Sequence, residues 1–158
     1  MRPYANSLRA MAFALLALLA ACKDDSGPEP IKYGRDACEM CGMIISDPRY
    51  VTEVRGGPEN RVKKFDDMGD AVTWLEKKGW GLAATKEFWA MNSEDGKTWL
   101  DARQSFFVHG DTPMNYGFAA VPDHREGSVT FDEMRAVVLA RGSTSMCPPD
   151  QRTGGAKP

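Results

Sequence analysis

The chain of 158 residues carries 20 lysines and arginines against 22 acidic residues, which leaves a formal net charge of −2. A nearly balanced charge without a basic cluster excludes proteins that grip nucleic acid through its phosphates, so no nucleic-acid partner is expected. The length suits one compact domain or two small units that share an interface.

Residues 1–21 have the pattern of a secretory signal that ends at a modified cysteine. Arg2 and Arg9 form a positive start, and the apolar run 11–20 is shorter than the roughly 20 residues that span a bilayer. The Leu-Ala-Ala before Cys22 resembles a bacterial lipobox, in which the cysteine is acylated. We therefore expect Cys22 to be lipidated and to anchor the chain to a membrane. A plain secretory signal with an unmodified cysteine is the alternative.

The chemistry is concentrated in residues 38–43, Cys-Glu-Met-Cys-Gly-Met, where four sulfur atoms lie within six residues. Thiolates and thioethers favour Cu(I) and are poor ligands for Mg²⁺, Ca²⁺ or Mn²⁺. If the end of this segment is extended, Cys41 and Met43 point to the same face. We expect a metal role for Cys41, and we take Met43, Cys38 and Met40 as further candidate ligands.

Other roles for the cysteines stay open. A thiol–disulfide oxidoreductase would use Cys38 and Cys41 as a redox pair, although such a motif normally opens a helix. A structural zinc site would need more ligands at a closed spacing. A disulfide suits an oxidising compartment, and a bond between Cys38 and Cys147 would leave Cys41 reduced.

Two segments 66 positions apart, 65–68 and 131–134, share the pattern Phe-Asp-acid-Met and precede apolar residues at helical spacing. We expect each to begin a helix, with Asp66 and Asp132 as N-caps that accept hydrogen bonds from free backbone N–H groups. Asp66 and Asp67 could instead form a general acid–base pair, but the cap interpretation also explains the second copy.

Strand-like segments flank both helices and predict an α+β fold of two small duplicated β-β-α-β-like units that share a core. We expect these strands at 42–45, 50–55, 61–65, 88–91, 97–100, 106–109, 116–121 and 128–131. The expected division is a signal peptide over 1–21, a lipid-anchored flexible tether over 22–36, a first unit over 37–85, a second unit over 86–142, and a flexible C-terminal tail over 143–158.

Two residues of the second unit are also candidate copper ligands. Met114 follows a proline in a turn of polar and small residues, whereas most methionines fill gaps in a core. His109 stands at the end of an apolar strand, and imidazole suits copper.

In their order along the chain, these elements resemble the NosL family, the copper-binding lipoproteins that accompany nitrous oxide reductase. The resemblance covers nearly the whole chain and rests on the lipobox, Cys41–Met43, Phe65–Asp67, Trp99–Ala102, Phe106–Val108, Met114 and Ala119–Pro122. It implies a fold of two similar β-β-α-β units and Cu(I) bound by Cys41, Met43 and Met114.

The sequence and this resemblance together predict a Cu(I) chaperone and not an enzyme. The expected partners are copper, a membrane reached through the lipid anchor, the client enzyme nitrous oxide reductase and its membrane assembly complex. We expect the chain in the cell envelope, facing the periplasm, and Lys23 after the lipid cysteine favours the outer membrane. A membrane-anchored oxidoreductase and a purely structural lipoprotein are the alternatives.

Overall fold

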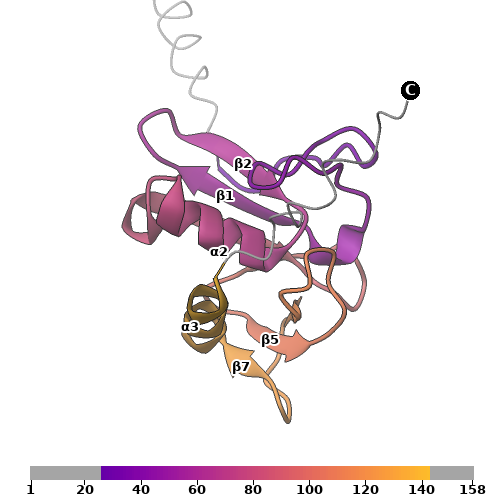
Figure 1. The fold of residues 1–158 in the computed structure, drawn as a ribbon. Coiled ribbons are helices and arrows are strands. Elements are labelled where there is room, and N and C mark those ends of the chain that lie inside the picture. The colour runs from indigo at the N-terminus through magenta and orange to yellow at the C-terminus, as the bar shows by residue number, and fades with distance from the viewer. Residues whose placement is uncertain (1–25, 143–158) are drawn as a thin grey trace, which may run out of the picture.

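The computed structural model describes residues 26–142, which form two antiparallel sheets and two α-helices (Figure 1). The first sheet has the strand order β2-β1-β3-β4, and the second has the order β6-β5-β7. The strands are β1 (Thr52–Gly56), β2 (Arg61–Phe65), β3 (Thr85–Met91), β4 (Trp99–Asp101), β5 (Phe106–His109), β6 (Phe118–Val121) and β7 (Val129–Thr130). The α-helices are α2 (Met68–Lys77) and α3 (Phe131–Arg141), and short 3-10 helices are η1 (Pro48–Tyr50) and η2 (Leu82–Ala84).

The predicted α+β class is confirmed, and the first unit has the expected β-β-α-β order in β1, β2, α2 and β3. In the second sheet, the described strands β5, β6 and β7 all precede α3. β3 and β4 pair with the first sheet, so that sheet extends past residue 86, where the second unit was expected to begin.

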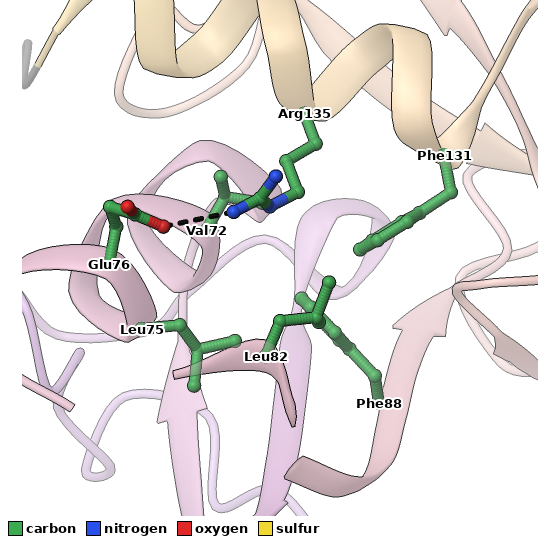
Figure 2. A pocket seen from close by; sticks show the side chains of 7 residues that line it. All are labelled: Val72, Leu75, Glu76, Leu82, Phe88, Phe131 and Arg135. Carbon is green, nitrogen blue, oxygen red and sulfur yellow. Dashed lines mark hydrogen bonds and ion pairs between the residues drawn. The ribbon is translucent and has the colours of Figure 1, made fainter. Parts of the chain in front are cut away.

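The two units share one core, in which α2 and α3 lie side by side (Figure 1). Figure 2 shows where the two units meet. Phe88 of β3 packs edge-on against Phe131 of α3, with ring centroids 5.3 Å apart. At the rim of this contact, Arg135 of α3 donates to Glu76 of α2 at 2.9 Å. The burial of this aromatic pair fixes how the second unit sits on the first.

The expected helix caps were wrong by one position in α2 and by two in α3. Asp67, not Asp66, caps α2, because its carboxylate accepts from the Gly69 N–H at 2.9 Å. Thr130, not Asp132, caps α3 and forms a capping box with Glu133. In both copies of the repeated motif, the phenylalanine and the methionine are buried. The helices start at different points of the motif, however, because α3 begins at Phe131 whereas α2 begins three residues after Phe65.

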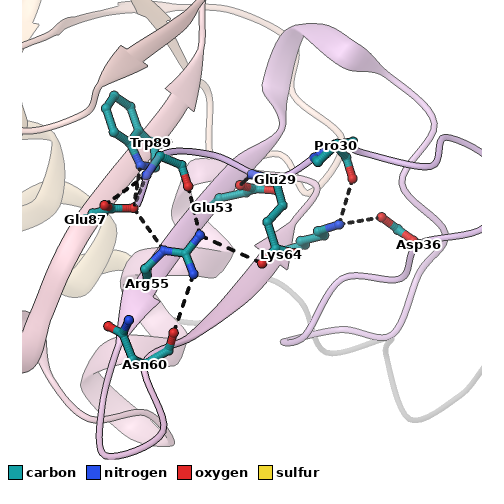
Figure 3. A network of polar contacts seen from close by, with 10 residues as sticks. Glu29, Pro30, Asp36, Glu53, Arg55, Asn60, Lys64, Glu87 and Trp89 are labelled. Carbon is teal, nitrogen blue, oxygen red and sulfur yellow. Dashed lines mark hydrogen bonds and ion pairs between the residues drawn. The ribbon is translucent and has the colours of Figure 1, made fainter. Parts of the chain in front are cut away.

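The segment expected as a flexible tether is docked on the first sheet from Gly27 onward. The Gly27 N–H donates to Glu87 at 3.0 Å, and the Gly27 carbonyl accepts from Arg55 at 2.9 Å. The Glu29 N–H donates to Glu53 at 2.8 Å, and the Pro30 carbonyl accepts from Lys64 at 2.9 Å (Figure 3). We call residues 27–31 the strap, and residues 32–37 connect it to the turn that carries Cys38 and Cys41.

Several expectations fall on residues that the structure does not describe. These are the signal peptide over 1–21, the lipid site at Cys22, the tail over 143–158 and Cys147 with its suggested disulfide. Within residues 26–142, neither α-helix combines the length and the apolar character that crossing a bilayer requires.

Candidate metal centre

The two cysteines lie on a compact turn between the strap and β1. Ala37 and Ile44 form an isolated antiparallel bridge, and inside it the Cys38 N–H donates to the Met43 carbonyl at 2.8 Å. The Gly42 N–H then donates to the Cys38 carbonyl at 2.9 Å, and Gly42 adopts a φ of 77°, which favours glycine. The expected strand over 42–45 is thus reduced to this bridge, because the chain turns back within the motif.

The turn places both thiols against two aspartates at the start of α2. Sulfur and carboxylate oxygen atoms of Cys38, Cys41, Asp66 and Asp70 all lie within 4.8 Å of one another. Cys38 Sγ is 3.2 Å from Asp70 Oδ2, and Cys41 Sγ is 3.7 Å from Asp66 Oδ1. We call this group the Cys-Asp cluster.

The elements that converge here explain the geometry. The Glu39 N–H donates to the Lys64 carbonyl at 2.9 Å, which fastens the turn to the end of β2. Asp66 follows β2 directly, and Asp70 lies in the first turn of α2, so the chain brings both carboxyl groups to this junction. The cluster is therefore built from the cysteine turn on one side and the β2–α2 junction on the other.

The Cys-Asp cluster is closed on most sides. Cys38 is 2%, Asp66 4% and Asp70 0% exposed, whereas Cys41 is half-buried and gives the cluster its contact with solvent. Burial raises the pKa of the Cys38 thiol far above its ordinary range and that of Cys41 to about 11. Burial also raises the pKa of Asp66. Both cysteines are therefore neutral thiols at pH 7, and a metal must displace their protons to bind.

Met114 approaches the same junction through its backbone. Its N–H donates to Asp67 Oδ2 at 3.0 Å, while the other oxygen of Asp67 caps α2. Burial raises the pKa of Asp67 to about 6. The Tyr116 ring lies on Gly69, where an added Cβ would come within 1.9 Å of it. The turn that carries Met114 is thereby held against the first turn of α2, next to Asp66.

The other expected ligands differ in position. Met43 is 51% exposed beside Cys41, and half-buried Met40 packs against the core, as do Cys41 and Met114. His109 is exposed at the end of β5, with its ring 5.2 Å from that of Phe118, and it is not a member of the Cys-Asp cluster.

The sequence analysis did not take the two aspartates of the Cys-Asp cluster as candidate ligands. Asp66 was assigned to a helix cap, and Asp70 was not singled out. A usable signal was present, because Asp70 stands between Gly69 and Ala71 in a helix whose neighbouring residues are apolar and buried. A carboxyl group in such surroundings needs a polar or metal partner.

No known family model and no curated protein sequence matches the chain. Among solved structures, the chain is similar to the crystal structure of the copper chaperone NosL from Shewanella denitrificans. The TM-score is 0.54 at 17% sequence identity, and the match covers 73% of this chain and 88% of that chain. The chain therefore has a NosL-like fold.

Proposed function

We propose that the chain is a copper chaperone that binds Cu(I) at the cysteine turn and does not catalyse a reaction. The observation that carries the proposal is the convergence of Cys38 and Cys41 within 4.8 Å, as part of the Cys-Asp cluster, on a NosL-like fold. The solved structure compared above is of a copper chaperone.

The donor set supports Cu(I) as the cargo. Two thiolates suit a soft monovalent ion, and thioethers from Met43 and Met114 would complete the coordination without adding charge. Met43 is 51% exposed, so its thioether can yield to a partner's ligand during transfer. We give Cys38 a larger role than the sequence alone suggested, because its thiol lies in the same group as that of Cys41.

The oxidoreductase alternative loses support from the same geometry. Reactive redox cysteines have a lowered pKa, commonly at a helix N-terminus. Here burial raises the pKa of both thiols, and the motif forms a turn that precedes a sheet. A buried pair beside two aspartates fits metal binding better than thiol exchange.

The cellular setting in our proposal follows from the N-terminal sequence. The chain would be exported, acylated at Cys22 and held at the outer membrane, facing the periplasm. It would hand copper to a copper enzyme, with nitrous oxide reductase and its membrane assembly complex as the expected partners.

Competition against a chromophoric Cu(I) chelator under anaerobic conditions tests the metal claim. The purified chain carries Cys22→Ser and Cys147→Ser, so that only Cys38 and Cys41 supply thiols. We expect one Cu(I) per chain, and the largest loss of affinity with Cys41→Ser, because a hydroxyl replaces the soft, ionisable donor.

Three further variants sharpen this test. Cys38→Ser should also weaken binding, and Met43→Leu should weaken it less, since a thioether is a neutral ligand. His109→Ala is the matched control, because His109 is exposed and outside the Cys-Asp cluster. Undiminished Cu(I) affinity in Cys41→Ser would refute the proposed function.

A further inference from the structure

One end of the first unit collects positive charge from two separate segments of the chain. The β1–β2 turn and the C-terminal end of α2 lie on the same side of the molecule (Figure 1), and Trp80 joins them, because an added Cβ on Gly57 would come within 2.5 Å of its ring. We call residues 57–63 and 77–86 the basic end. It holds one acidic residue, Glu59, and five basic residues, Arg61, Lys63, Lys77, Lys78 and Lys86, although the whole chain has a net charge of −2.

Most of this charge is not used within the fold. Lys77, Lys78 and Lys86 are exposed, and none of the ion pairs among residues 26–142 involves them. Lys77 and Lys78 complement the negative end of the α2 dipole, but Lys86 lies in β3, where that role does not apply. These cations are therefore available to a negatively charged partner outside the chain.

The same end has a partly exposed tryptophan beside a shallow hollow. The hollow has a volume of about 230 Å³ and is lined by Gly56, Pro58, Glu59, Arg61, Lys63 and Trp80. The Trp80 ring is held in place, because its Nε1–H donates to Thr85 Oγ1 at 3.0 Å. Tryptophan gathers at the interface between membranes and water, where basic side chains also reach the lipid headgroups. The basic end therefore has the composition of a surface that rests on a bilayer.

The strap brings the N-terminal segment to this end. Arg55 donates to the Gly27 carbonyl at 2.9 Å and to the Asn60 carbonyl at 3.5 Å, so the strap starts beside the β1–β2 turn (Figure 3). Only residues 23–26 lie between Gly27 and Cys22. Acyl chains on Cys22 would therefore enter the membrane next to the basic end.

We propose that the basic end is a docking surface for the anionic headgroups of a phospholipid bilayer. The inference rests on the proposed function only for the lipid at Cys22. Helix α2 spans 10 residues, about 15 Å, with its C-terminal end in the basic end and its first turn at the Cys-Asp cluster. Docking would therefore turn the copper site away from the membrane and toward a partner in the periplasm, whereas a lipid anchor alone would leave the orientation free.

Vesicle binding by a chain without acyl groups tests the surface apart from the anchor. The protein begins at residue 22 and carries Cys22→Ser, so it lacks the apolar run 11–20 but keeps every described residue. Reduced, metal-free protein is sedimented with vesicles of phosphatidylcholine alone, and with vesicles of phosphatidylcholine and phosphatidylglycerol in equal parts. We expect binding to the second kind only, and its loss at high salt, because headgroup charge drives it.

Two matched pairs of charge variants locate the contact. Lys77→Gln with Lys78→Gln should weaken binding roughly 25-fold, since each basic side chain at an anionic surface contributes a factor of about 5. Lys32→Gln with Arg35→Gln removes the same charge elsewhere and should change binding far less, because salt at about 0.1 M screens charges beyond about 10 Å. Those two residues are exposed and follow the strap, whose last residue packs against Val51 at the opposite end of β1.

Tryptophan quenching shows which end meets the bilayer. A nitroxide on the lipid headgroup quenches a tryptophan that lies at the vesicle surface. We expect the parent chain to be quenched on binding, and Trp80→Phe to remove most of this quenching. Trp99→Phe is the matched control, because Trp99 is also partly buried but packs with Val51 and Met91 at the opposite end.

Each result separates the docking surface from the proposed function. Equal binding to both kinds of vesicle, or equal losses in the two pairs of charge variants, would overturn the docking surface even if Cu(I) binds and Cys22 is acylated. Quenching that persists in Trp80→Phe would overturn it too, and if that variant does not fold, the charge variants decide. Absence of binding to any vesicle at low salt would also overturn it and would point to a protein partner.

The vesicle assay uses neither copper nor acyl chains. A chain that failed to bind Cu(I) but kept its preference for phosphatidylglycerol would therefore refute the chaperone and leave the docking surface standing.

Discussion

Glu53 offers a prediction whose size follows from its position under the strap. It lies at the centre of the first sheet, is 0% exposed, and uses one oxygen to accept the Glu29 N–H at 2.8 Å. Its other oxygen is buried and has no hydrogen-bond partner. Burial, offset in part by this hydrogen bond and by Lys64, raises the pKa of Glu53 from 4.5 to about 7.

The sign of the pH effect follows from this shift. The folded chain keeps the Glu53 proton up to about pH 7, whereas the unfolded chain loses it near the ordinary glutamate pKa of 4.5. The free energy of unfolding therefore falls as pH rises through this window and stays low above it. The rise of the Glu53 pKa from 4.5 to about 7, at roughly 1.36 kcal/mol for each tenfold change in proton affinity, gives a penalty on the order of 3 kcal/mol.

Glu53→Gln removes the ionisable group and keeps the shape, so the variant should be more stable than the parent by on the order of 3 kcal/mol at about pH 8 and similar to it at about pH 4. Urea unfolding of the metal-free, reduced chain, followed by tryptophan fluorescence, measures the difference. Glu59→Gln, at an exposed acid of the neighbouring turn, is the control, and the difference in stability between this variant and the parent should show little pH dependence. The same difference between parent and Glu53→Gln at both pH values would refute the reasoning.

Three further predictions concern packing, capping and the anchor. Gly69→Ala should destabilise the chain by about 1–3 kcal/mol in thermal or urea unfolding, because its Cβ would overlap the buried Tyr116 ring; unchanged stability would contradict this packing. Thr130→Ala should cost about 0.5–2 kcal/mol and Asp132→Ala less than about 0.5 kcal/mol, and the opposite order would restore Asp132 as the cap. Cys22→Ser should yield a chain without acyl mass that is soluble or unprocessed; unaltered membrane attachment would count against lipidation.

The core of the fold could be predicted from the sequence, because its buried residues follow the local periodicity of helices and strands. The apolar residues at helical spacing in the first helix are Met68, Ala71, Val72 and Leu75, and all four are buried. Apart from the segment 42–45, the expected strands overlap the observed ones, since alternating apolar residues and turn residues mark them.

The candidate metal site was harder to predict from the sequence, because its geometry depends on where the pairing between β1 and β2 ends. Thr52 of β1 pairs with Phe65 as the last partner in β2, so Asp66 leaves the sheet toward the cysteines and Asp67 becomes the cap. Two adjacent aspartates are chemically equivalent as caps, and only the register of the sheet distinguishes them. Asp70 meets Cys38 across 32 residues, which no local pattern encodes.

The docked strap also limits how far the chain can travel from its anchor. If Cys22 carries the proposed lipid, only five residue steps separate it from Gly27, and a fully extended chain covers at most about 18 Å in that length. A tether free through residue 36 would have allowed roughly 50 Å. The first sheet would therefore lie close to the bilayer surface, and the chain would meet its partners by diffusion in the plane of the membrane. Copper would pass only to acceptor proteins whose copper-binding groups lie within about one protein diameter of the same membrane.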